Sequence, residues 1–198
     1  MKFTRLILIL AAISLACWLG AGLAQAAEFS ALVINRAGSQ ETQGKIYLQG
    51  EKMRQEFSNG EGMSINISRP DKQVMWMIMP DQKMYMEMQF SQSDLGKTMA
   101  MPKDQGQMKL LGTETVNGYE TEKYETTVQG RGKTRKHYLW VSKKLGVPIK
   151  MVSQDGSFSM EYRDIKEGGL PAGLFEVPQG YQKMTMPQGM PQGMPPRR

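Results

Sequence analysis

Residues 74–88 read VMWMIMPDQKMYMEM, with methionine at every second position on both sides of a central four-residue segment, 80–83. A period of two is that of a β-strand, whose successive side chains point to opposite faces of a sheet. Proline, aspartate and glutamine in the centre are typical of a turn. We therefore predict a hairpin that places six thioethers on one face. The facing pairs are Met79 with Met84, Met77 with Met86, and Met75 with Met88.

This set of six side chains is the candidate binding wall. Burying one methionine contributes roughly 1.5–3 kcal/mol, so six represent on the order of 10 kcal/mol as an upper bound. The sequence leaves three alternatives for what these side chains contact: the protein's own core, an acyl chain, or a soft metal ion such as Cu(I) or Ag(I). The opposite face becomes more polar away from the turn, from Ile78 with Tyr85 to Trp76 with Glu87, which favours turning the methionines inward. We expect no cofactor, and the hydrophobic-wall interpretation comes first.

The metal alternative would add thioethers from the C-terminal tail. These residues are Met184, Met186, Met190 and Met194. The chain has a single histidine, His137, which shares a strand face with Leu139 and Val141 and is predicted to be structural. Metal sites commonly recruit histidine, so this scarcity weighs against copper.

The rest of the mature chain alternates between short strand patterns and turn signals such as Asn59-Gly60 and Asn117-Gly118. Roughly ten strands at spacings of about 8–12 residues predict a mainly β, antiparallel fold. Residues 91–109 break the pattern. We interpret them as a gating segment over the wall, with Met99, Met101 and Met108. The sequence contains no nucleophile, zinc or phosphate-loop motif, so we do not expect an enzyme.

The first 26 residues predict an export signal. Lys2 and Arg5 precede an apolar run, and Ala24-Gln25-Ala26 is a small-x-small cleavage site. We therefore expect a periplasmic protein. Lipid anchoring at Cys17 is the less favoured alternative, because Ser14 stands where a lipoprotein box has leucine. The formal net charge of +6 is scattered and export is predicted, so nucleic acid is not an expected partner. We expect a monomer.

Several stretches of the sequence resemble an uncharacterised family of exported bacterial proteins allied to the LolA-like lipoprotein-carrier group. They are residues 46–54 (IYLQGEKMR), 111–124 (LGTETVNGYETEKY), 139–141 (LWV), 146–149 (GVPI) and 174–178 (LFEVP). The resemblance implies a strongly curved antiparallel sheet forming a half-open β-barrel, with one or two helical segments covering its concave face. It also implies that the hollow holds acyl chains of lipids or lipoproteins. An envelope protein is a further partner that we consider.

The resulting domain plan has three parts. Residues 1–26 are the signal peptide, and residues 27–183 form the half-barrel domain. Residues 184–198 repeat methionine, proline, glutamine and glycine, a composition that predicts a disordered tail. The methionine content is unusual for the resembled family, and the tail has no counterpart in it. A non-catalytic envelope adaptor module, whose ligand is an edge strand of another protein, is a further alternative.

Overall fold

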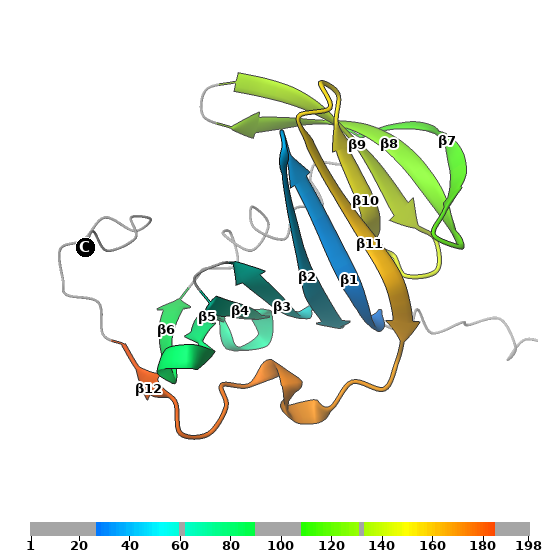
Figure 1. The fold of residues 1–198 in the computed structure, drawn as a ribbon. Coiled ribbons are helices and arrows are strands. Elements are labelled where there is room, and N and C mark those ends of the chain that lie inside the picture. The colour runs from blue at the N-terminus through cyan, green and yellow to red at the C-terminus, as the bar shows by residue number, and fades with distance from the viewer. Residues whose placement is uncertain (1–26, 60–61, 90–107, 131–132, 185–198) are drawn as a thin grey trace, which may run out of the picture.

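One large, curved, open β-sheet forms the fold (Figure 1). The computed structural model describes residues 27–59, 62–89, 108–130 and 133–184. The first strands are β1 (Glu28–Ala37), β2 (Gln40–Gln49), β3 (Lys52–Asn59), β4 (Gly62–Arg69), β5 (Val74–Met79) and β6 (Met84–Gln89). The later strands are β7 (Lys109–Val116), β8 (Tyr119–Gly130), β9 (Lys133–Ser142), β10 (Pro148–Ser153), β11 (Phe158–Glu167) and β12 (Gln182–Lys183).

The strand order is β12-β6-β5-β4-β3-β2-β1-β11-β10-β9-β8-β7. Two runs of sequential hairpins therefore meet at the antiparallel pair of β1 and β11. All neighbours in the sheet are antiparallel except β12, which joins β6 in parallel. The predicted mainly antiparallel β class is confirmed, and the described residues contain two more strands than the sequence count of ten.

Helical structure among the described residues is limited to 3-10 turns. They are η1 (Pro70–Lys72), η2 (Pro80–Gln82) and η4 (Ala172–Phe175). The turn η4 belongs to a C-terminal segment, residues 170–181, that passes beneath β3–β6 in Figure 1. The covering element predicted as helical is thus a single short turn in the described part of the chain. In that part, no helix is long and apolar enough to span a membrane.

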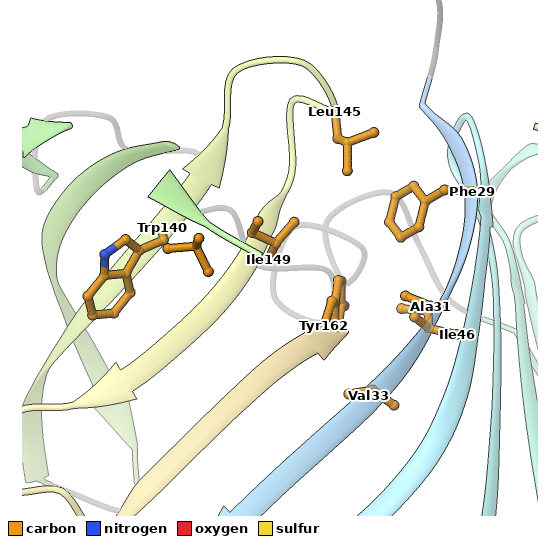
Figure 2. Packing of buried hydrophobic residues seen from close by; sticks show 9 residues of the cluster. Phe29, Ala31, Val33, Ile46, Trp140, Leu145, Ile149 and Tyr162 are labelled. Carbon is orange, nitrogen blue, oxygen red and sulfur yellow. The ribbon is translucent and has the colours of Figure 1, made fainter. Parts of the chain in front are cut away.

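Two buried clusters within the described part of the chain stabilise the sheet. The central cluster gathers side chains from β1, β2, β7 and β9–β11 and from the turn between β9 and β10 (Figure 2). Its fully buried members include Phe29, Ile46 and Ile149, and the rings of Phe29 and Tyr162 lie 6.2 Å apart between centroids. The second cluster forms where Phe175 packs against β4 and β5. The two clusters share no buried residue.

Candidate ligand-binding face

The methionine hairpin has the predicted register. Met79 pairs with Met84, Met77 with Met86, and Met75 with Met88. The link is η2, which begins at Pro80 because its fixed φ suits the first position of a helical turn. Lys83 closes the turn in the left-handed conformation, with φ of 51°, and its backbone N–H donates to the carbonyl of Pro80 at 3.1 Å. Since paired strand residues share a face, all six thioethers lie together on what we call the methionine face.

All six methionines are half-buried. The face behind them is the more deeply buried one: Ile78 is 0% exposed and Trp76 is 7% exposed. The inference from polarity, that the opposite face would be the outer one, is therefore wrong. The C-terminal segment 170–181 covers that face with Phe175 and, around it, Leu174 and Val177. This covering comes from almost a hundred residues away and leaves no trace in the local alternation.

Arg69 fastens this C-terminal segment to the sheet. Its guanidinium is buried and donates twice to Asp71, at 2.8 and 2.7 Å, and once to the carbonyl of Phe175 at 3.1 Å. It also pairs with Glu176, whose carboxylate accepts a second hydrogen bond from Lys72 at 2.9 Å. The hydrogen bonds from Arg69 lower the pKa of Asp71 to about 2. A charged residue at the end of β4 therefore closes the face opposite the methionines.

A second polar contact on that opposite face secures β12. The indole N–H of Trp76 donates to Glu87 at 3.0 Å, and the ammonium of Lys183 donates to the other carboxylate oxygen at 2.7 Å. These hydrogen bonds, that of Lys183 foremost, lower the pKa of Glu87. Glu87 is thus a connector between the second cluster and the last strand rather than a free polar group.

The methionine face continues into the central cluster. Following the cross-strand pairs from β6 to β1 gives one row of side chains on the same face: Met86, Met77, Asn66, Gln55, Ile46 and Ala31. Within this row the side-chain oxygen of Asn66 is buried and has no hydrogen-bond partner among the described residues. A buried acceptor without a donor costs about 1–3 kcal/mol. Sequence reasoning missed Asn66, because a polar residue in an alternating strand ordinarily indicates the solvent side.

The other predicted site residues are placed only in part. Met108, just before β7, and Met184, just after β12, are half-buried. Met99, Met101, Met186, Met190 and Met194 lie outside the described residues, so the gating segment and the tail stay predictions. His137 is half-buried on β9, and its Nδ1 is buried without a partner in the described part. Its cross-strand partner is Thr126, and no group of three histidine, cysteine, aspartate or glutamate side chains suited to a metal occurs in the described part of the chain.

A surface pocket of about 460 Å³ lies elsewhere, at the start of β8, and is lined by Tyr119, Lys143, Lys144 and Glu167. Its polar side chains already pair with one another: Glu167 accepts from Tyr119 at 2.9 Å and from Lys144 at 2.7 Å. These exposed, mutually satisfied groups make it a weaker candidate than the methionine face.

Comparison with solved structures shows the same fold in several bacterial proteins. An uncharacterized conserved protein from Thermus thermophilus aligns with a TM-score of 0.58 at 15% identity, over 81% of this chain and 91% of that one. MucB in the MucA/MucB complex of Pseudomonas aeruginosa aligns with a TM-score of 0.53 at 12% identity, over 86% of this chain and 63% of that one. MucB in complex with MucA(peri) aligns with a TM-score of 0.52 at 14% identity, over 86% and 62%.

At such identities the likeness concerns the fold alone. No curated protein sequence matches the chain. A family model does match: it is described as a domain of unknown function, DUF4412, and it covers residues 31–147, more than half of the chain. The protein belongs to the DUF4412 family.

Proposed function

We propose that this protein is a non-catalytic periplasmic carrier that binds an acyl-bearing ligand, a lipid or a lipoprotein, against its methionine face. One observation carries the proposal. The two faces of β5 and β6 differ: the Trp76 side is closed by the chain's own C-terminal segment, whereas the six methionines on the other side are only half-buried. Half-buried apolar side chains in this number retain surface that a hydrophobic ligand can cover.

Methionine suits a ligand without fixed shape. Its unbranched, flexible side chain re-packs around different partners, as promiscuous binding surfaces require. The apolar surface also extends inward, because half-buried Leu48, Met53 and Phe57 pack against the central cluster and share the methionine face by register. An acyl chain lying along the hairpin could continue over these residues.

Asn66 supplies a polar point beside the apolar wall. Its side-chain oxygen, which has no hydrogen-bond partner among the described residues, lies between Met77 and Gln55 in the same row. An amide N–H or a hydroxyl near the head of an acylated ligand would satisfy this acceptor. Sites for apolar ligands commonly combine an extended hydrophobic lining with a few such polar groups that fix orientation.

The test is native mass spectrometry of the protein purified from its own envelope without a delipidation step, followed by organic extraction and lipid analysis. We expect acyl-bearing mass to copurify with the wild type. The double variant Met77→Gln/Met86→Gln places two amides in the methionine face, and most of the copurifying acyl-bearing mass should be absent from it. The control Met63→Gln alters a methionine that is 46% exposed on β4 and should keep it. A clean apo mass for the wild type contradicts the proposal.

A protein partner is the second candidate, and the complexes of MucB with MucA favour it, since they show a protein of this fold bound to another protein. Cross-linking in intact cells with a photoreactive residue in place of Met86 distinguishes the two. A protein adduct without copurified lipid supports the adaptor role, and a lipid adduct supports the carrier role.

A further inference from the structure

The last strand extends the methionine face by one residue. In the parallel pair, Gln182 is opposite Met84 and Lys183 is opposite Tyr85. The backbone N–H of Met184 then donates to the carbonyl of Tyr85 at 2.8 Å, so the ladder continues to that residue. The side chain of Lys183 lies on the opposite face, where it reaches Glu87. Because strand residues alternate, Met184 falls on the methionine face beside Met86.

Met77, Met86 and Met184 therefore form one row across three adjacent strands, β5, β6 and the end of β12. Neighbouring strands are about 4.8 Å apart, which puts the outer two residues of the row roughly 10 Å apart. Each side chain has three rotatable bonds, so the outer two sulfurs can lean toward the middle one. The three are half-buried, which leaves access from solvent while limiting competition from water.

We propose that this row binds a soft monovalent cation of the Cu(I) or Ag(I) class through three thioether sulfurs. Thioethers are soft, neutral ligands that favour Cu(I), whereas Mg²⁺ and Ca²⁺ prefer oxygen ligands. Glu87 and Lys183, the neighbours in sequence of Met86 and Met184, bind each other on the other face. The pairs Met75–Met88 and Met79–Met84 flank the row and offer further sulfurs for exchange. This inference stands without the proposed carrier function.

The arrangement differs from an ordinary methionine-filled core in one respect. A core role predicts sulfurs packed against a buried cluster, as half-buried Met160 packs against the central cluster. Among the described residues, the three methionines of this row pack against neither cluster, and they lie on the three strands at the sheet edge. No cluster of three histidine, cysteine, aspartate or glutamate side chains suited to a metal occurs among the described residues. The proposed site is thus built from thioethers alone.

The experiment is an Ag(I) titration of the full mature chain, labelled with ¹³C at the methionine methyl groups and followed by NMR. A parallel Cu(I) titration under reducing conditions uses a chromophoric chelator as competitor. We expect the methyl signals of Met77, Met86 and Met184 to shift together at one equivalent. The variant Met77→Leu/Met86→Leu/Met184→Leu, which conserves volume, should bind at least about tenfold more weakly.

The matched control is Met151→Leu/Met160→Leu, which removes a facing methionine pair on β10 and β11 without a third member. It should keep wild-type affinity. Equal loss in both variants, or Ag(I) shifts confined to methyl groups outside the row, overturns the proposal. If the triple variant fails to fold, the affinity of the single variant Met184→Leu tests the proposal, since this variant changes only the residue after a two-residue strand. Unchanged affinity in that variant removes the three-sulfur site. A protein that copurifies with no lipid can still pass this test, so the two proposals fail separately.

Discussion

Protonation of Asp71 at low pH should weaken the contacts that hold the C-terminal segment against the sheet. Its pKa of about 2 in the folded protein lies below the usual value of about 3.9, because Arg69 donates two hydrogen bonds to the carboxylate. A depressed pKa stabilises the fold at pH values above the unfolded pKa. That stabilisation is lost as the pH falls from about 4 toward 2. We expect the free energy of unfolding, measured with urea, to fall over this window in the wild type.

Asp71→Asn removes the titrating group and should flatten that part of the pH dependence while lowering stability at pH 7. The control is Asp164→Asn, which changes an exposed carboxylate that has no ion pair within the described residues. It should keep the wild-type slope. Equal slopes for wild type and Asp71→Asn between about pH 4 and 2 would show that the contact with Arg69 does not carry the effect.

Glu87 should decide whether β12 stays in place. Its carboxylate joins Trp76 to Lys183, and Glu87→Ala removes both hydrogen bonds. We expect amide hydrogen exchange at Gln182 and Met184, which donate to the carbonyls of Lys83 and Tyr85, to accelerate at least about tenfold. Glu125→Ala removes a surface ion pair with Lys136 and should leave these amides unchanged. Unaltered exchange in Glu87→Ala would mean that the backbone ladder alone secures the strand.

The pair of strands β2 and β3 depends on one glycine. A methyl group on Gly44 would lie 2.6 Å from the ring of Phe57, its cross-strand partner, and closer still to the carbonyl of Glu56. Gly44→Ala should destabilise the protein by about 1–3 kcal/mol, because the ring and the strand must shift. At Gly173, in η4, an added methyl group would meet no atom of the described residues within 4 Å beyond its two chain neighbours, so Gly173→Ala should be nearly neutral. Thermal unfolding of both variants tests this, and similar melting temperatures would refute it.

The elements differ in how far the sequence predicts them. The methionine hairpin can be predicted from the sequence because two local signals agree. The alternation of residues determines which side chains share a face, and the turn at 80–83 determines the register. The strand β12 cannot be predicted from the sequence, since two residues are too few to show a periodicity. It forms because Lys183 and Met184 make tertiary contacts with β6. For the same reason the burial of Trp76 and Ile78 escapes prediction, because Phe175 and Arg69 bring the covering segment from far along the chain.

At the scale of the whole molecule, the described residues form one sheet with two separate buried clusters. The central cluster lies on the face that continues into the methionine face, and the second cluster lies on the other face under Phe175. Under the proposed carrier function, one face would adapt to a ligand while the other keeps β4–β6 in place. The same separation means that damage to one core should not spread directly to the other.

This separation yields a prediction for the whole molecule. Phe175 and Ile149 are 1% and 0% exposed and belong to different clusters. Phe175→Ala should cost about 3–5 kcal/mol and Ile149→Ala about 2–5 kcal/mol, and the double variant should equal their sum within about 0.5 kcal/mol. Hydrogen exchange should accelerate mainly in β4–β6 for the first variant and mainly in β9–β11 for the second. A uniform loss of protection in either variant, or a coupling above about 1 kcal/mol, would show that the two faces unfold as one unit.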